Sequence, residues 1–288
     1  MAAPELSEWI GHHRHRETEV DARQAALLAA TLDVDAPQSG DPLPPLWHWA
    51  AAEQPVPTSN LGHDGHEKKG GFLPPVPLPR RMWAGGSLEF AGILRVDQPL
   101  VQDSVVSQVI EKQARSGPMV LVSVDHTLTG ATGRIKERHN IVFLQSPDRY
   151  SPPPPIPPMQ DPVIDQAYPM NTTRLFRYSA CTFNGHRIHY DLDFARQIER
   201  YPNLLVHGPL QATLMIAAAT SHMGRCPDRF EYRAVHPMFP DAPVRILARP
   251  CEGGLHMCTA RGTEHQGMQA TAMWTDASTV DDALRPDH

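Results

Sequence analysis

The architecture follows from one apolar run, Pro209-Leu210-Gln211-Ala212-Thr213-Leu214-Met215-Ile216-Ala217-Ala218-Ala219-Thr220-Ser221-His222. Pro209 stands where a helix can begin, because the first turn leaves its amide groups without intrahelical acceptors and proline lacks the hydrogen. The residues behind it have the length and apolar content of a helix packed in a protein core. We therefore predict a helix over 209–222.

Strand-like runs surround this helix and recur earlier in the chain. We predict a strand over 174–181 and a short helix over 191–200 before it, and strands after it over 229–236, 244–251, 254–261 and 268–274. In the first half, a helical pattern over 20–32 precedes strand-like runs over 87–96, 105–113, 119–128 and 140–145. Each half therefore reads as a helix followed by a four-strand antiparallel meander.

A helix wrapped by a curved antiparallel sheet is the hotdog plan. We predict the α+β class and a double hotdog, in which two curved antiparallel sheets each wrap around a central helix. The segment Ser151-Pro152-Pro153-Pro154-Pro155-Ile156-Pro157-Pro158 can continue neither a helix nor a sheet ladder. The predicted organisation is an N-terminal hotdog over 1–150, a Pro-rich linker over 151–170 and a C-terminal hotdog over 171–288. Region 33–81, rich in Pro, Gly and His, is longer than a usual connection and predicts a functional lid or a mobile segment.

Composition excludes several classes of protein. The chain has 288 residues and a formal net charge of −6, with no basic stripe that could follow a phosphate backbone. The longest apolar window, 204–219, is interrupted by His207, Pro209 and Gln211 and is too short to span a bilayer. No secretory signal is recognisable, so we expect a cytoplasmic location, where the four cysteines would be reduced thiols.

Two pieces of the C-terminal half look like an acid/base site: Thr182-Phe183-Asn184-Gly185-His186-Arg187-Ile188-His189-Tyr190-Asp191 and Val206-His207-Gly208-Pro209. A histidine held at a turn can transfer protons near neutral pH. The Gly208 amide would lie at the positive end of the helix dipole, where it can stabilise an oxyanion. By itself Gly208-Pro209 is equally consistent with a simple helix start.

The residues from Tyr178 to Ala195 resemble the hydratase motif of the MaoC-like (R)-specific enoyl-CoA hydratases. His189 matches the family histidine, and Ala195 the small residue six positions later. Asn184 stands where the family has an Asp. The phrase from Phe176 to Asp191, with His207-Gly208-Pro209, is similar to a branch of mitochondrial 3-hydroxyacyl-thioester dehydratases and bacterial mesaconyl-CoA or itaconyl-CoA hydratases. In the first half, Gly71-Phe72-Leu73-Pro74-Pro75 and Pro79-Arg80-Arg81-Met82-Trp83-Ala84-Gly85-Gly86 also resemble that branch.

The resemblance implies reversible hydration and dehydration of enoyl-CoA and 3-hydroxyacyl-CoA thioesters, with a short branched dicarboxylic acyl group such as itaconyl or mesaconyl as one candidate. His189 would take the proton of water, and the Gly208 amide would hold the thioester oxygen. The C-terminal hotdog would be catalytic, and the N-terminal hotdog would accommodate the acyl group and CoA.

Asn184 cannot act as a base, although its amide can orient water or the His189 ring. Either His189 makes both proton transfers, or a second group such as His186 or Asp191 contributes. Asn184 could equally be a turn residue, since Asn184-Gly185 is a strong turn signal, and Asp191 a helix N-terminal charge. A hotdog thioesterase and a non-catalytic acyl-CoA-binding protein are the alternative functions.

Arg80, Arg81 and Trp83 are candidates for CoA binding, because guanidinium binds phosphate and an aromatic face stacks on adenine. Arg80 and Arg81 could equally be a solvated pair of charges on a loop. We also predict substrate contacts for His186, Arg187 and His207, with Arg187 as one possible partner of a free carboxylate. The histidines of 12–16 and 63–66 lack a ligand framework, so we expect no metal and no cofactor beyond the substrate's CoA. The expected partner is an acyl-CoA thioester, without nucleic acid or membrane, and a homodimer is one expected assembly.

Overall fold

The computed structural model describes residues 5–52, 55–114 and 117–275; the ends of the two predicted halves, 1–4 and 276–288, lie outside the described residues. The helices of the described residues are α1 (Ala22–Leu32), α2 (Thr172–Cys181) and α3 (Gly208–Met223), with shorter turns η1 (Leu6–Trp9), η2 (Trp47–Ala51), η3 (Thr58–Asn60), η4 (Arg187–His189) and η5 (Phe194–Ile198). The strands are β1 (His13–Thr18), β2 (Arg80–Gly92), β3 (Leu100–Ala114), β4 (Gly117–Thr129), β5 (Gly133–Leu144), β6 (Ile164–Tyr168), β7 (Arg229–Ala234), β8 (Val244–Cys251), β9 (Gly254–Arg261) and β10 (His265–Met273).

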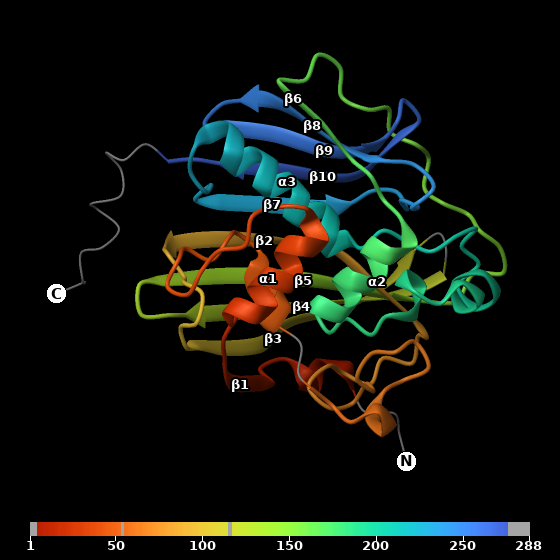
Figure 1. Ribbon diagram of the computed structural model, residues 1–288. Coiled ribbons are helices and arrows are strands. Elements are labelled where there is room, and N and C mark those ends of the chain that lie inside the picture. The colour runs from red at the N-terminus through yellow and green to blue at the C-terminus, as the bar shows by residue number, and fades with distance from the viewer. Residues whose placement is uncertain (1–4, 53–54, 115–116, 276–288) are drawn as a thin grey trace.

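The strands of the described residues form one antiparallel sheet rather than the two that the sequence predicts. Their order is β1-β3-β4-β5-β2-β7-β10-β9-β8-β6. The two meanders meet where β2 pairs with β7, from Gly85 opposite Arg233 to Glu89 opposite Arg229. Each meander would otherwise end in an open edge with unpaired N–H and C=O groups, and the β2–β7 ladder satisfies both edges at once. Figure 1 shows the continuous sheet face on.

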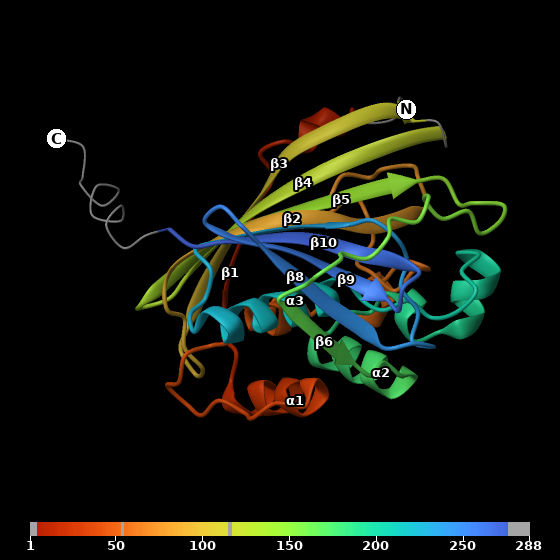
Figure 2. The same ribbon diagram turned by 90° about the horizontal axis from the view of Figure 1, so that it is seen from above.

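The predicted helix over 209–222 is confirmed as α3, which lies closest to the sheet. Figure 2 shows α1, α2 and α3 on the same face of the sheet. Leu210, Met215 and Ile216 of α3 are fully buried, and burying an aliphatic side chain of this size stabilises the fold by roughly 1.5–3 kcal/mol. Helix α1, the predicted helix over 20–32, packs against α2 and η2. Of the two predicted central helices, α3 packs against the strands, whereas α1 packs mainly against other helices.

The strand predicted over 174–181 is wrong, because this segment is helix α2. Asn171 caps it by accepting a hydrogen bond from the Arg174 amide. Leu175, Tyr178 and Ser179 are buried at three- and four-residue spacing, while Phe176 is exposed. That spacing has the period of a helix face, whereas a strand would bury every second residue.

The predicted strands otherwise exist with shifted ends, and β8 and β9 have the predicted bounds. Strand β2 starts at Arg80, seven residues earlier than predicted, so the Arg80-to-Trp83 segment is part of the sheet and not a loop. The helix predicted over 191–200 is mainly the π-helical turn η5. Strand β1, which falls in the His-rich run, was not predicted and pairs with β3.

Between β5 and β6 the chain from 145 to 163 forms neither helix nor strand, and it includes the Pro-rich segment. Proline lacks the amide hydrogen that a ladder needs, which accounts for this irregular path. The gaps at 53–54 and 115–116 aside, no helix of the described chain is long and apolar enough to cross a membrane.

Candidate active site

The first motif forms a compact loop between α2 and η5. Helix α2 ends at Cys181, and the Thr182 hydroxyl donates to the Tyr178 carbonyl oxygen at 2.7 Å. Phe183 then adopts a left-handed conformation with φ of 53°. This turns the chain so that the backbone N–H of Asn184 donates to the Ser179 carbonyl oxygen at 2.9 Å. The loop leads into η4, whose last residue is His189.

His189 is held in one tautomer by the main chain. Its Nδ1–H donates to the Leu205 carbonyl oxygen at 2.9 Å, so the lone pair of the ring is on Nε2. Burial lowers the pKa of His189 to about 4, and the hydrogen bond to Leu205 opposes only part of this shift. A buried imidazole that is neutral at neutral pH can accept a proton through Nε2.

Gly208 is the first residue of α3, so its N–H has no acceptor within the helix. A Cβ atom at this position would lie 2.7 Å from the Cε3 atom of Trp83, so glycine is needed for this close approach. Trp83 in turn stacks on Tyr232, with ring centroids 4.6 Å apart. This packing fixes the Gly208 amide at the positive end of the helix dipole.

His207 lies behind His189, and it is missing from the described residues that line the cavity. Its side chain is fully buried, and its Nε2 atom forms a hydrogen bond with the Ser179 hydroxyl at 2.8 Å. Its ring stacks on that of His189. His207 therefore lies outside the described cavity lining, and the substrate contact predicted for it stays a prediction.

Asn184 and His186 are at the same end of the cavity as His189. The Asn184 Oδ1 atom accepts a hydrogen bond from the His186 amide at 3.0 Å, which is an Asx-type turn interaction. The rings of His186 and His189 lie 5.5 Å apart in an edge-on arrangement. Asn184 thus makes a turn and also borders the cavity, so the two alternatives from the sequence are compatible.

A loop from region 33–81 packs onto the motif. A Cβ atom on Gly65 would lie 1.9 Å from the Gly185 carbonyl oxygen, and one on Gly185 would lie 2.4 Å from the Gly65 carbonyl oxygen. The Arg187 amide donates to the Asp64 carbonyl oxygen at 3.0 Å. Segments about 120 residues apart are therefore joined main chain to main chain, and only glycine at both positions permits this contact.

This loop brings Asp64 and His66 next to His186. The Asp64 Oδ2 atom accepts a hydrogen bond from His66 Nδ1 at 3.0 Å. Burial favours the neutral acid, but the bond to His66 and the charges of His66 and Arg81 outweigh it and lower the pKa of Asp64. The ring centroids of His66 and His186 lie 4.3 Å apart. Asp64, His66, His186 and His189 therefore follow one another as a series of neighbouring side chains.

The same three residues are a candidate for metal binding. One ligand atom from each of Asp64, His66 and His186 lies within 4.8 Å of the others, and zinc accepts two imidazoles and a carboxylate as ligands. Asp64 and His66 are hydrogen-bonded to each other in the structure. The absence of a metal stays a prediction from the sequence.

The cavity bordered by His189 has a volume of about 1050 Å³ and extends from the C-terminal half into the N-terminal half. Its C-terminal end is lined by Asn184, His186, His189 and Gly208, and its N-terminal end by His48, Gln102, His126, Glu137 and His139. Trp83 lines the wall as well, next to Gly208.

The N-terminal end of the cavity is polar, which the sequence analysis missed. Glu137 is buried and accepts hydrogen bonds from His48 Nε2 at 3.0 Å, Trp49 Nε1 at 2.7 Å and His139 Nε2 at 2.5 Å. Burial would raise the pKa of Glu137, but the charge of His139 and these bonds hold it well below its usual range. The spacing of Glu137, His139 and Ile141 along β5 could have revealed this face, had the strand not been predicted to begin at 140.

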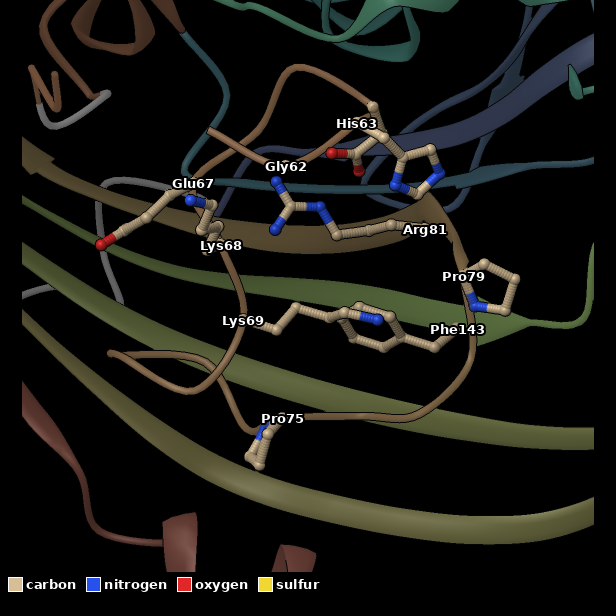
Figure 3. Close-up of a pocket in the computed structure, with 10 residues that line it drawn as sticks. Gly62, His63, Glu67, Lys68, Lys69, Pro75, Pro79, Arg81 and Phe143 are labelled. Atoms are coloured by element: carbon tan, nitrogen blue, oxygen red, sulfur yellow. The ribbon is translucent and has the colours of Figure 1, made fainter. Parts of the chain in front are cut away.

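A second hollow of about 370 Å³ lies beside the cavity and shares Glu67 and Arg81 with it. Figure 3 shows Arg81, Lys68 and Lys69 around this hollow. Lys69 Nζ donates to the Val76 and Leu78 carbonyl oxygens at 2.6 and 2.7 Å. Three cationic side chains against Asp64 and Glu67 leave the lining with a net positive charge.

The other residues predicted to bind CoA have different environments. Arg80 forms an ion pair with Glu199, with Nε and Oε2 2.8 Å apart, and hydrogen-bonds the Tyr201 hydroxyl. Trp83 packs against Trp49, Tyr232 and Gly208 and also lines the cavity wall. Arg187 is absent from the described cavity lining; it pairs with Asp191 at 2.7 Å on the surface. Arg80 and Arg81 both line the large cavity, and of the two Arg81 also lines the second hollow.

Residues 46–240 match the family model described as hydroxyacyl-thioester dehydratase type 2. The chain belongs to the hydroxyacyl-thioester dehydratase type 2 family. It is 40% identical over 255 residues to mesaconyl-C(4)-CoA hydratase of Chloroflexus aurantiacus, covering 87% of this chain and 91% of that protein. It is 28% identical over 235 residues to the mitochondrial hydroxyacyl-thioester dehydratase type 2 of Schizosaccharomyces pombe, covering 71% and 77%. The resemblance inferred from the sequence is confirmed.

Solved structures show the same fold as this family member. A MaoC-like dehydratase from Phytophthora capsici superposes with a TM-score of 0.69 at 13% identity, covering 96% of this chain and all of that one. A Mycobacterium tuberculosis protein described as having a double hotdog fold superposes with a TM-score of 0.55 at 13% identity, covering 94% and 98%. The hotdog prediction is confirmed at the level of the fold.

Proposed function

We propose that this protein catalyses the reversible hydration of an enoyl-CoA thioester, with His189 as the base. One observation carries the proposal. The Leu205 carbonyl oxygen binds the Nδ1–H of His189, which leaves the basic Nε2 lone pair on a ring that borders the same cavity as the Gly208 amide. Base and oxyanion donor are the pair that addition of water to an enoyl thioester needs.

In this mechanism His189 Nε2 takes a proton from water as the water oxygen bonds to the β-carbon. The electrons of the double bond move toward the thioester, whose oxygen becomes an enolate oxyanion and accepts a hydrogen bond from the Gly208 amide. A fixed donor of this kind lowers the barrier by roughly 3–4 kcal/mol. A proton delivered to the α-carbon completes the product, and dehydration follows the same steps in reverse.

The second proton needs a donor, since Asn184 cannot supply one. His66 borders the cavity together with His189, and Asp64 accepts its Nδ1–H. A carboxylate in that position stabilises the imidazolium form and orients the ring. We assign the α-carbon proton to His66, and to Asn184 the orientation of the attacking water.

For the CoA part of the substrate, the proposal uses the second hollow. Its net positive lining suits the phosphates, and it shares Arg81 with the catalytic cavity, so one thioester could reach from one to the other. Lys68 and Lys69 were not predicted from the sequence. They replace Arg80 and Trp83 in the proposed CoA site.

The acyl group that we propose is short and polar. Mesaconyl-C4-CoA is the first candidate because a 40% identical relative is named as its hydratase, and the polar N-terminal end of the cavity suits a second carboxylate better than a long alkyl chain. The homodimer and the cytoplasmic location stay predictions.

The test measures mesaconyl-C4-CoA and crotonyl-CoA with the wild-type protein and with His189→Ala. We expect the wild type to remove the ultraviolet absorbance of the conjugated double bond, and His189→Ala to lose about 10²-fold or more of that rate. His222→Ala, at an exposed position near the end of α3, is the matched control. Release of free thiol without hydration would indicate the thioesterase, and binding without turnover the non-catalytic alternative.

A further inference from the structure

The hydrogen-bond chain at the N-terminal end of the cavity fixes the tautomer of His126. The Arg16 guanidinium donates from Nε to the Gln102 Oε1 atom at 3.0 Å, which sets the orientation of that side-chain amide. Gln102 Nε2 therefore faces His126 Nδ1, at 3.1 Å, as a donor. The Ser104 hydroxyl also lies 2.8 Å from His126 Nδ1. Nδ1 is consequently the acceptor, and the ring carries its proton on Nε2.

The His126 ring is neutral at neutral pH. Burial, with a smaller contribution from the charge of His139, lowers the pKa of His126 to about 3. Its Nε2–H is thus a neutral donor. Among the described residues no acceptor forms a hydrogen bond with it, although the side chain lines the cavity. A polar group in a largely buried position without a partner is costly unless a ligand or water satisfies it.

His126 lies beyond Trp83 as seen from the proposed catalytic groups. Trp83 contacts Gly208 on one side, and its ring is 5.9 Å from that of His139 on the other. The rings of His139 and His126 are 4.8 Å apart. One indole and one imidazole therefore separate the Gly208 amide from His126, and both residues line the same cavity.

We propose that His126 Nε2–H binds a carboxylate on the acyl group, at the end remote from the thioester, and so makes the enzyme selective for dicarboxylic acyl-CoA. This inference rests on the proposed function and deepens it. Arg16 stands behind Gln102 and contributes the positive charge that favours an anion there. Among the described residues Glu137 accepts hydrogen bonds from His48, Trp49 and His139 and none from His126.

The experiment compares dissociation constants for succinyl-CoA and butyryl-CoA, saturated thioesters of four acyl carbons that differ in carboxylate against methyl. Neither can be hydrated, so binding is read without turnover. We expect the wild type to bind succinyl-CoA at least tenfold more tightly. His126→Ala should weaken succinyl-CoA binding about tenfold or more and leave butyryl-CoA within about twofold. His256→Ala, a histidine exposed on β9, should change neither.

A second variant tests the tautomer without removing the ring. In Gln102→Glu the carboxylate can only accept from His126, which moves the ring proton to Nδ1 and turns a lone pair toward the ligand. Succinyl-CoA binding should weaken as in His126→Ala, in a protein with unchanged circular dichroism. Equal effects on both thioesters, or equal wild-type affinity for both, would overturn the inference. A protein without this selectivity could still hydrate mesaconyl-C4-CoA, so the proposed function would survive that result. If instead the wild type binds succinyl-CoA selectively but hydrates neither enoyl thioester, the proposed function alone is rejected.

Discussion

The rings of His189 and His207 stack, with centroids 3.7 Å apart and planes inclined by 21°. His207 also directly precedes Gly208 in the chain. One residue therefore contacts the proposed base through its buried ring and is covalently linked to the proposed oxyanion donor. Burial and the neighbouring His189 hold the pKa of His207 well below its usual range, so it stays neutral. We therefore expect His207 to position His189 rather than to bind the substrate.

Replacing His207 by Phe tests this role. His207→Phe keeps an aromatic ring for stacking but removes the bond to Ser179, so His189 should lose part of its orientation. We expect kcat to fall about tenfold with KM within about twofold, the pattern of an interaction made in the transition state. Ser179→Ala removes the same bond, so the double variant should cost little more than either single one. Additive losses would contradict the shared mechanism.

Lowering the pH should destabilise the protein through its buried histidines. His186, His189 and His207 are neutral when folded, with pKa values lowered mainly by burial, whereas in the unfolded chain they bind protons near pH 6.5. The unfolded state therefore binds more protons below pH 6.5, and the free energy of unfolding should fall from about pH 6.5 toward pH 4, the folded pKa of His189.

Urea unfolding between pH 7.5 and 4.5 measures this dependence, and His189→Asn should reduce its slope by the share of one proton. The same pKa places the acid limb of kcat/KM near pH 4, wherever the protein remains folded. An acid limb near pH 6.5 in folded protein would show that another group is the base.

Arg80 and Arg81 should respond differently to substitution by Ala, although they are adjacent. Arg80→Ala leaves Glu199 buried without its cation, so the free energy of unfolding should fall by about 3 kcal/mol. Arg81→Ala removes a cation from the proposed phosphate hollow and should raise KM for CoA thioesters more than it lowers kcat. Denaturation curves and initial rates on both variants give the comparison. A normal KM for Arg81→Ala would place the CoA elsewhere.

Substitutions of Asn184 and of Asp64 should have different effects on the kinetics. If Asn184 orients water, Asn184→Ala lowers kcat/KM without moving its pH profile, and Asn184→Asp is at least partly tolerated. If Asp64 orients the His66 ring for proton transfer, Asp64→Asn lowers kcat. Asp103→Asn, whose exposed partner is His15, is the control. Metal-dependent recovery of activity after treatment with a chelator would reassign Asp64, His66 and His186 to a metal site.

The sequence predicts those helices and strands that are determined by a local pattern of residues. Helix α3 is predicted because a long apolar run follows Pro209, and strands β8 and β9 have the predicted bounds. Helix α2 differs from the predicted strand because its buried residues, Leu175, Tyr178 and Ser179, are spaced by three and four positions. Strand β1 was missed because an edge strand is held by main-chain bonds to β3 and needs no apolar pattern.

For the site, proximity in sequence decided what could be predicted. His189, Asn184 and Gly208 belong to two short motifs, so the sequence alone predicts them as site residues. Their roles stay proposals. Asp64 and His66 reach the motif only through the contact of Gly65 with Gly185, which no local pattern encodes. Similarly, no local pattern shows that Arg80 pairs with Glu199, which lies far away in the sequence.

The β2–β7 ladder also bears on how the chain could be divided. Because the two meanders share main-chain hydrogen bonds across Gly85 to Glu89, a cut within 151–158, where the structure has neither helix nor strand, would leave two polypeptides that still present complementary edges. The peptide link then acts as a tether that keeps one edge at high effective concentration near the other. Complementation between separately expressed fragments would be governed by this ladder, and the cavity that both fragments line would form only on their association.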